Sequence, residues 1–224
     1  MGSALRLPTT KLDAAPLPAA PRSGRSQIPL RLTAAVLVAA AGFYLLGQGL
    51  YIEAKAAVAQ VLLDRAFLAG VASGHTAKPW PWADTWPVAR ISVARLGAQA
   101  IVLESGSGQA LAFGPGHLAG TPAPGDPGTS VIAAHRDTHF AFLGELVPGD
   151  EIVVERGNGT TKRFRVAGRS IVRFDAYRVD PGAKVRRLAL VTCWPIGALT
   201  SGPLRLVVEA EMVEDSQTTN RRAS

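Results

Sequence analysis

Cysteine is almost absent from this chain of 224 residues, which contains one, and histidine is scarce, with four. One cysteine cannot form an intramolecular disulfide framework, and so few histidines beside it exclude a cysteine-rich zinc module. Aromatic residues make up only 6% of the sequence, but hydrophobic residues make up 47%, which excludes a disordered or fibrous chain. The length fits one folded domain with accessory segments.

Charge is absent from residues 32–52, whose sequence is LTAAVLVAAAGFYLLGQGLYI. A helix of this length would measure about 31 Å, roughly the thickness of the hydrocarbon core of a bilayer. The mean hydropathy of the whole chain, +0.16, is also high for a soluble protein. We therefore expect a transmembrane signal anchor at residues 32–52. A signal peptide cleaved near Ala54, Ala56 and Ala57 and a buried core helix are the alternatives.

Most of the excess positive charge precedes that apolar run. The chain has a formal net charge of +7, and residues 1–31 carry five basic residues and one acidic residue. The positive-inside rule predicts that residues 1–31 form a disordered basic tail in the cytoplasm and that the rest of the chain lies across the membrane. Export disfavours nucleic-acid binding. The arginines in strand-like positions are interpreted as a solvated or lipid-facing surface: Arg163, Arg165, Arg169 and Arg173.

A helical stalk is expected at residues 53–77, because residues 53–73 are rich in Ala and Leu and carry an apolar stripe at helical spacing. Prolines at positions 79, 81 and 87 prevent this helix from continuing. Three of the four tryptophans lie among these prolines: Trp80, Trp82 and Trp86. We interpret them as packing the stalk onto the folded domain, with a membrane-interface or substrate surface as the alternative.

From Val88 onward, short β-prone runs alternate with turn residues. The candidate strands are 88–95, 99–104, 109–113, 129–134, 151–156, 161–173, 187–193 and 204–212. Asn158 and Gly159 form a strong turn signal that predicts a hairpin between 151–156 and 161–173. About eight short strands with little helix predict an all-β fold, either a closed or partly closed barrel or a sandwich. The polar residues 214–224 are expected to be a disordered C-terminal tail.

The single cysteine, Cys193, ends the apolar run RLALVTC. Pro195 cannot continue a central strand, so the sulfur is expected at a strand end beside a loop that substrate can reach. An unpaired thiol in an oxidising compartment is a hazard unless it is used, which favours a nucleophile. A small buried hydrophobic residue is the alternative.

Two further residues supply matching chemistry. His135 ends the run TSVIAA in the same manner, and Arg205 lies on the strand after Cys193, where antiparallel pairing can turn its guanidinium toward the sulfur. A thiolate attacks a peptide carbonyl, a histidine protonates the leaving amine, and a guanidinium holds the developing oxyanion. The three residues therefore suit acyl transfer. His139 could form a metal pair with His135 only on a continuous helix, and the preceding run is a strand.

The stretches GHLAGTPAPGDPGTSVIAAHRDTHFAFLGELVPGD and RLALVTCWPIGALTSGPLRLVV resemble the sortases, which are membrane-anchored cysteine transpeptidases. The neighbouring segment KPWPWADTWPVARISV is similar to the proteobacterial branch, class GN. The resemblance covers residues 78–213 and implies a sortase-like catalytic domain, an eight-stranded β-barrel with short helices. It depends on a strand that ends in Thr-Cys, an arginine on the next strand, and the upstream Ala-His-Arg-Asp-Thr together.

The resemblance implies that Cys193 is the catalytic nucleophile and that His135 and Arg205 are the other catalytic residues. Thr192 and Trp194, beside the nucleophile, are implied as substrate-binding residues. Such an enzyme cleaves a C-terminal LPxTG-like sorting signal between Thr and Gly, forms a thioacyl intermediate, and transfers the protein to an amine acceptor.

The same resemblance implies a single-pass protein of the inner membrane, with a cytoplasmic N-terminus and a periplasmic catalytic domain. Its partner would be a protein that carries the sorting signal, and the acceptor amine stays open because Gram-negative cells lack the thick wall. Neither a cofactor nor a metal is expected, since the acidic residues Glu104, Asp137 and Glu145 are scattered. Loops 174–186 and 194–203 are expected to set the preference for the signal.

Two other classes of protein remain as alternatives. In a non-enzymatic membrane-anchored β-domain, Cys193 would be a core residue that thiol reagents do not reach in the native protein. An L,D-transpeptidase-like enzyme also combines Cys, His and Arg in an exported β-rich domain, but its cysteine typically follows Ser-His-Gly and closely precedes an arginine. Leu-Val-Thr precedes the cysteine here, and Ile196 follows it closely.

Overall fold

The computed structural model describes residues 27–105, 107–179, 183–198, 200 and 202–213. The expected C-terminal tail, residues 214–224, and most of the expected N-terminal tail, residues 1–26, lie outside these ranges. The prediction of a disordered tail is wrong for residues 27–31, which are helical. The chain divides into two compact units, one ending at Gly49 and the other beginning at Leu50. The boundary falls within the long helix α1 (Gln27–Ser73).

Helix α1 is apolar and exposed in its first part. From residue 31 to Gly49 every side chain is exposed, and the helix is long and apolar enough to cross a membrane. It ends at Ser73, because Gly74 takes a left-handed φ of 72° and donates its N–H to the carbonyl of Gly70 at 2.9 Å. Glycine adopts this conformation without the steric cost of a Cβ atom. Residues 53–73 of the expected helical stalk are thus the second part of the same helix, and the prediction is wrong for residues 74–77, which lie beyond its end.

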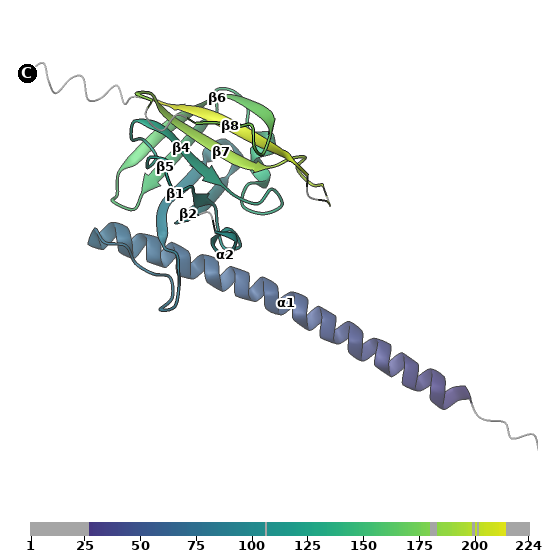
Figure 1. Ribbon diagram of the computed structural model, residues 1–224. Coiled ribbons are helices and arrows are strands. Elements are labelled where there is room, and N and C mark those ends of the chain that lie inside the picture. The colour runs from purple at the N-terminus through teal and green to yellow at the C-terminus, as the bar shows by residue number, and fades with distance from the viewer. Residues whose placement is uncertain (1–26, 106, 180–182, 199, 201, 214–224) are drawn as a thin grey trace, which may run out of the picture. The chain divides into compact units, whose positions relative to one another are not determined.

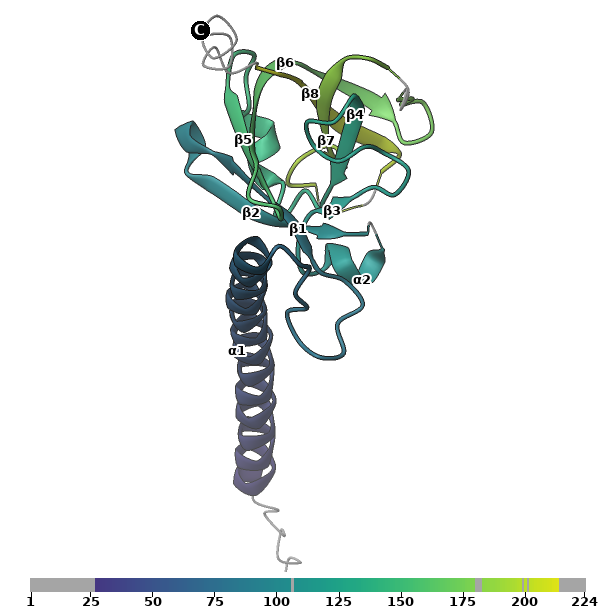
Figure 2. The same ribbon diagram turned by 90° about the vertical axis from the view of Figure 1, so that its left-hand side faces the viewer.

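Eight strands form a closed barrel, which confirms the predicted fold (Figures 1 and 2). They are β1 (Pro87–Val93), β2 (Ala98–Glu104), β3 (Gly116–His117), β4 (Gly128–Ala133), β5 (Glu151–Arg156), β6 (Thr161–Arg173), β7 (Arg186–Cys193) and β8 (Leu204–Met212). The order around the barrel is β1-β2-β3-β4-β7-β8-β6-β5. Strands β2 and β3, and likewise β4 and β7, run parallel, and the other neighbours run antiparallel.

One predicted strand is wrong. Residues 109–113 belong largely to the single-turn helix α2 (Gly108–Leu111), and the short strand β3 comes after them. Ser107 caps α2 by accepting a hydrogen bond from the N–H of Ala110 at 3.2 Å. So short an apolar run has no decisive periodicity, and the capping serine favours the helix. The 3-10 turns η1 (Ala94–Leu96) and η2 (Ala141–Glu145) are the other short helices.

The predicted hairpin joins β5 and β6, although its loop, residues 157–160, is longer than a two-residue turn. The side-chain oxygen of Asn158 accepts hydrogen bonds from the N–H of Thr160 at 3.1 Å and from its hydroxyl at 2.7 Å. Gly159 then takes a φ of 78°, which only glycine adopts at low cost. The Asn-Gly pair therefore fixes the turn as the sequence predicts.

The barrel interior is the main core, and alternate residues of each strand fill it. Large side chains that are fully buried there include Ile91, Ile132, Phe140, Phe164, Leu188 and Leu190. A second cluster fixes the stalk, since Leu63 and Phe67 of α1 pack against Ile101, Leu103 and Ala110. Each such buried Leu or Phe contributes about 1.5–3 kcal/mol, so the second part of α1 is an integral part of the folded domain.

The three tryptophans of the proline-rich segment differ in their environment. Trp80 is half-buried and meets Phe113 edge to face, with ring centroids 5.2 Å apart. Trp86 is also half-buried, but Trp82 is 83% exposed. The predicted packing role therefore fits Trp80, which contacts Phe113, and is wrong for Trp82.

Candidate active site

Cys193 and Arg205 are paired across two neighbouring strands. Cys193 is the last residue of β7, and the antiparallel register of β7 with β8 sets it opposite Arg205. Opposed residues in such a pair have Cα atoms about 5 Å apart and side chains on the same face. Cys193 is half-exposed at this strand end, unlike a cysteine of the core.

His135 approaches the same strand end from β4, on the other side of β7. The parallel register of β4 with β7 sets Ala133 beside Val191, and the N–H of Ala134 continues the ladder by donating to the carbonyl of Val191 at 3.1 Å. Two residues beyond that last pair lie His135 on one strand and Cys193 on the other. The sheet therefore brings the three predicted catalytic residues to one edge, with the cysteine on the middle strand.

All three side chains face away from the barrel interior. Thr192 and Leu206, the neighbours of Cys193 and Arg205, are buried at 2% exposure each, and Ala134 packs in the barrel core. Because successive side chains of a strand point to opposite faces, the residues next to them turn outward. The same outer face of β4, β7 and β8 carries a small buried cluster of Val131, Ala189 and Val207, which side chains such as Leu118, Val172 and Tyr177 cover.

Thr192, a predicted substrate-binding residue, is used inside the protein. Its hydroxyl donates a hydrogen bond of 2.7 Å to the carbonyl of Ala134, and both residues are buried. This bond ties the end of β7 to the end of β4, one residue before Cys193 and one residue before His135. The structure thus gives Thr192 a part in setting the spacing of these strands.

The guanidinium of Arg205 is held in place by its own loop. Its Nη1 donates to the carbonyls of Gly202 at 2.9 Å and Leu204 at 2.8 Å, and its Cζ lies 5.9 Å from the ring centroid of Phe174. Among the described residues these hydrogen bonds engage Nη1 alone. The remaining N–H groups of the fork can donate to an oxygen that approaches Cys193.

Arg136, which the sequence analysis does not assign to the site, is buried next to His135. It is 6% exposed, and its Nη2 donates to the carbonyls of Ala198 and Thr200, the latter at 2.8 Å. Both acceptors lie in the loop that connects Cys193 to Arg205. Its Nη1 is buried without a hydrogen-bond partner in the part of the chain that the structure describes, and Asp137 approaches its Nε at 3.5 Å.

The neighbourhood of His135 also includes His139. His139 is half-buried, whereas His135 is exposed. Burial, which disfavours the charged imidazolium, and the nearby charge of His135 together lower the pKa of His139. The lowered pKa favours the neutral form of the His139 imidazole near pH 7.

Trp194, the other predicted substrate-binding residue, begins the loop after Cys193. Its N–H donates to the carbonyl of Leu204 at 3.0 Å, and its ring is half-buried against the barrel core. Ile196 follows it and packs against the same core. The structure therefore shows Trp194 anchoring one end of the loop, with part of its ring still exposed at the site.

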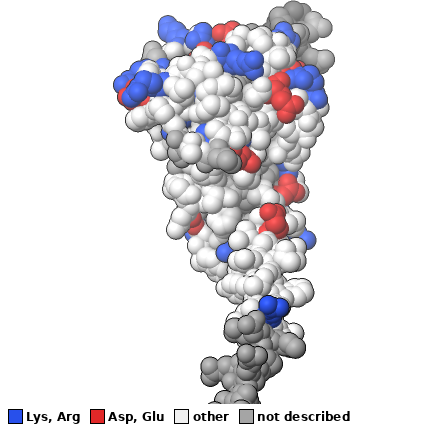
Figure 3. Space-filling view, turned by 90° about the vertical axis from the view of Figure 1, so that its right-hand side faces the viewer, with Lys and Arg blue, Asp and Glu red and all other residues white. Residues whose placement is uncertain are grey.

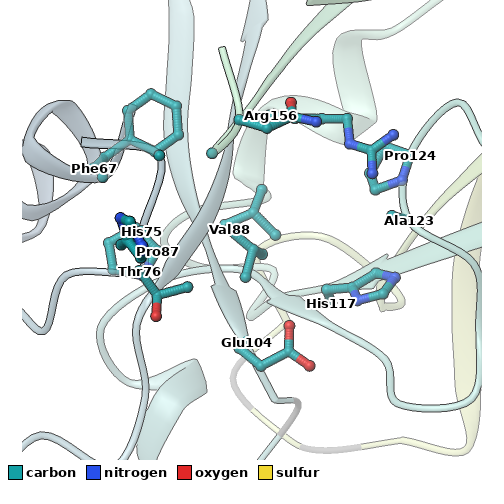
Figure 4. A pocket seen from close by; sticks show the side chains of 15 residues that line it. Phe67, His75, Thr76, Pro87, Val88, Glu104, His117, Ala123, Pro124 and Arg156 are labelled. Atoms are coloured by element: carbon teal, nitrogen blue, oxygen red, sulfur yellow. The ribbon is translucent and has the colours of Figure 1, made fainter. Parts of the chain in front are cut away.

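A separate cavity of about 340 Å³ lies away from these residues (Figure 4). It is lined by Val88 of β1, Glu104 at the end of β2 and His117 of β3. The Nε2 of His117 lies 3.0 Å from the carbonyl of Pro122. Since β3 and β4 run antiparallel, the chain at His117 moves away from the end of β4 that leads to His135. Neither Cys193 nor Arg205 lines this cavity.

Charged side chains gather at the upper end of the molecule in Figure 3. The arginines of β6 are exposed, and several have local partners: Arg163 pairs with Glu151 at 2.6 Å and Arg173 with Asp175 at 3.2 Å. This matches the interpretation of a solvated face. Among the described residues, no three His, Cys, Asp or Glu side chains form a group that could hold a metal ion.

Comparison with protein families finds a match for the barrel. The Sortase domain family matches residues 91–213, just over half of the chain. Sortase D of Bacillus subtilis (strain 168) is 24% identical over 123 residues, which are 55% of this chain and 62% of that relative. The chain thus spans less than two thirds of the length of this relative.

Solved structures of similar fold include sortase A from Corynebacterium diphtheriae, at 26% identity and a TM-score of 0.52, with 62% of this chain and 66% of that chain covered. Sortase C-1 from Actinomyces oris is 29% identical, with a TM-score of 0.50, and the match covers 58% of this chain and 76% of that chain. The matched fold is the barrel that carries Cys193, His135 and Arg205.

Proposed function

Because the chain belongs to the sortase family, we propose that it is a membrane-anchored cysteine transpeptidase of the class GN type. Its substrate is a protein with a C-terminal LPxTG-like sorting signal, which it cleaves between Thr and Gly. The observation that carries the proposal is the convergence of Cys193, His135 and Arg205 at one edge of β4, β7 and β8.

In the first half of the reaction, the thiolate of Cys193 attacks the carbonyl carbon of the Thr–Gly bond. The carbonyl oxygen becomes an oxyanion, and the free N–H groups of Arg205 donate hydrogen bonds to it. As the tetrahedral intermediate collapses, the carbon–nitrogen bond breaks and the imidazolium of His135 gives its proton to the departing glycine amine. The product is a thioester between the threonine carbonyl and the sulfur.

In the second half, an acceptor amine attacks the thioester carbonyl. The amine loses its proton to the neutral imidazole of His135, the carbon–sulfur bond breaks, and Cys193 leaves as a thiolate. The enzyme returns to its starting state, and the sorted protein gains a new amide bond. Arg205 serves both halves, because each passes through an oxyanion at the same position.

Residues near Cys193, His135 and Arg205 act by positioning these catalytic side chains. Thr192 fixes the spacing between the ends of β4 and β7 through Ala134. Arg136 holds the loop after Cys193 through two backbone carbonyls. Trp194, at the start of that loop, offers the exposed part of its ring to the sorting signal.

The membrane anchor is the apolar first part of α1, residues 32–52. The basic residues before it favour a cytoplasmic N-terminus, which leaves the barrel in the periplasm, beside the inner membrane. A tethered enzyme meets membrane-bound substrates in two dimensions, which raises their effective concentration.

The reaction class is tested with the full-length protein in detergent or proteoliposomes. A peptide containing LPxTG is added, and mass spectrometry monitors a thioester adduct on Cys193 and the release of the C-terminal fragment. We expect the adduct in the native protein and its absence in Cys193→Ala, which should stay folded. Labelling of Cys193 by thiol reagents without peptide cleavage, over a range of LPxTG variants and amines, would contradict the proposal.

A further inference from the structure

Trp82 stands at the tip of a tight turn on the outside of the stalk. The turn runs from Trp80 to Ala83, with the N–H of Ala83 donating to the carbonyl of Trp80 at 3.0 Å. Pro81 occupies the second position, which its fixed φ suits. Trp80 packs on Phe113 and Ala83 is 3% exposed, so both ends of the turn are fixed. The structure therefore presents the 83%-exposed Trp82 rigidly rather than on a loose loop.

An apolar groove of about 680 Å³ lies beside this turn. Val58, Ala59 and Leu62 of α1 and the aromatic rings of Trp80, Trp82 and Phe113 line it, and Lys55 and Asp84 are among its polar lining residues. Large exposed apolar surfaces of this kind mark contacts with a partner or a membrane. Among the large apolar side chains of the lining, Trp82 and Val58 are exposed, at 83% and 59%.

The groove begins close to where the apolar part of α1 ends. Leu50, Tyr51 and Ile52 are all more than 60% exposed, and Lys55 and Val58 follow on the same helix. At 1.5 Å per residue, Lys55 lies about 5 Å and Val58 about 9 Å past Ile52 along the helix axis. The interfacial layer on each side of a hydrocarbon core is about 5–8 Å thick, so this part of the groove falls at the depth of the lipid headgroups.

We infer that Trp82 and the groove around it dock into the headgroup layer of the membrane that holds α1. Tryptophan prefers this layer because its ring is apolar and its indole N–H can meet polar groups. Lys55 can extend its ammonium to lipid phosphates while its stem covers apolar surface. A second attachment beside the single span fixes the tilt of the barrel, and with it the height of the Cys193 edge above the bilayer.

This inference rests on the membrane anchor of the proposed function, and the experiment separates the two. The full-length protein is reconstituted in phosphatidylcholine–phosphatidylglycerol vesicles with acyl chains brominated near the headgroup or near the bilayer centre. The fluorescence emission of Trp82 is obtained by subtracting the emission of the Trp82→Phe variant from that of the native protein. Phe43→Trp and Val147→Trp, each made in the Trp82→Phe background, report the span and a position on the barrel that is 46% exposed.

We expect the Trp82 emission to be quenched by the shallow bromines and shielded from acrylamide in the water. Phe43→Trp should respond to lipid bromines, and Val147→Trp to acrylamide alone. If Trp82 behaves like Val147→Trp while Phe43→Trp is quenched by lipid, the docking is overturned and the anchor stands. If Phe43→Trp is also quenched only from the water, the anchor and the docking both fall.

Discussion

Cys193 of β7 and Arg205 of β8 are direct partners in an antiparallel register, and both turn to the outer face of the barrel. The preceding pair, Thr192 with Leu206, turns inward and is buried. Backbone hydrogen bonds of the sheet therefore set Cys193 opposite Arg205, and the carbonyls of Gly202 and Leu204 hold the guanidinium. A site built in this way needs little reorganisation when charge develops on the substrate.

Replacing Arg205 by lysine should be severe although the charge is kept. The planar guanidinium can bind its loop through Nη1 and still donate from its other nitrogens, whereas one ammonium cannot do both. We expect kcat for peptide cleavage to fall on the order of 100-fold with a small change in KM, as is typical for loss of an oxyanion donor. Steady-state kinetics with an LPxTG peptide measure this.

Arg187→Lys is the matched control, because Arg187 lies on the same face of β7 and pairs with Glu211 at 3.1 Å in solvent. It should retain nearly native kcat. An Arg205→Lys enzyme as active as this control would remove Arg205 from the chemistry.

The two neighbouring histidines should respond in opposite ways to alanine substitution. The register of β4 with β7 brings His135 level with Cys193, whereas His139 is half-buried four residues later and has a pKa lowered by burial and by the charge of His135. We expect His135→Ala to lose about 100- to 10,000-fold in kcat/KM, the usual range for a general acid–base. His139→Ala should keep most of the activity. An inactive His139→Ala beside an active His135→Ala would reverse our assignment.

The sequence predicts the strands that carry the site better than it predicts their neighbours. The runs ending at Cys193 and beginning near Arg205 are long, apolar and adjacent in the chain, so their antiparallel pairing is local. The pairing of β4 with β7 joins His135 to a partner 58 residues away, and no periodicity fixes that register. The sequence pattern places His135 at the end of an apolar strand, but its position beside Cys193 was implied only by the family resemblance.

Arg136 is a residue near the site that the sequence analysis does not predict. A charged residue after a strand is usually solvated, and the motif His-Arg-Asp reads as a polar turn. Its burial follows from the position of the loop after Cys193, which brings the carbonyls of Ala198 and Thr200 over the guanidinium. Only the assembled barrel reveals this contact.

The wrong prediction of a strand at residues 109–113 has a local reason. Ser107 caps the short helix α2, and the strand prediction did not take this cap into account.

Arg136→Met should loosen the loop between Cys193 and Arg205. The change removes the donor that ties the carbonyls of Ala198 and Thr200 to the end of β4, and each such hydrogen bond contributes about 0.5–1.5 kcal/mol. We expect a lower Tm, faster proteolysis within residues 194–203, and a rise in KM larger than the fall in kcat. Arg136→Lys should restore part of the KM, since an ammonium can still reach one carbonyl.

Arg163→Met provides the comparison for Arg136, because Arg163 is exposed and its ion pair with Glu151 lies in solvent. Surface pairs of this kind contribute little to stability. Equal Tm and KM in the two variants would show that Arg136 does not hold the loop.

Asp150 should make the stability of the barrel sensitive to acid. Arg95 holds its carboxylate by two hydrogen bonds, at 2.6 and 2.7 Å, and the N–H of Val147 adds a third at 2.8 Å. The hydrogen bond from Arg95, helped by that from Val147, lowers the pKa of Asp150 although burial opposes the shift. The folded protein therefore binds this proton less tightly than the unfolded chain, whose carboxyl has a pKa of about 3.9.

The stabilisation from Asp150 is fully present above the unfolded pKa and is lost as the pH falls through the lower pKa of the folded state. Urea unfolding in detergent at pH 7, 5, 4 and 3, taken as buffer settings, should show native stability falling fastest below about pH 4. Asp150→Asn should be less stable at neutral pH and should approach the native protein as the pH falls. Asp175→Asn, at an exposed carboxylate, is the control. A constant difference between native protein and Asp150→Asn at every pH would exclude the Arg95–Asp150 contact as a source of acid sensitivity, since only a carboxyl that titrates between the two pKa values can make that difference change.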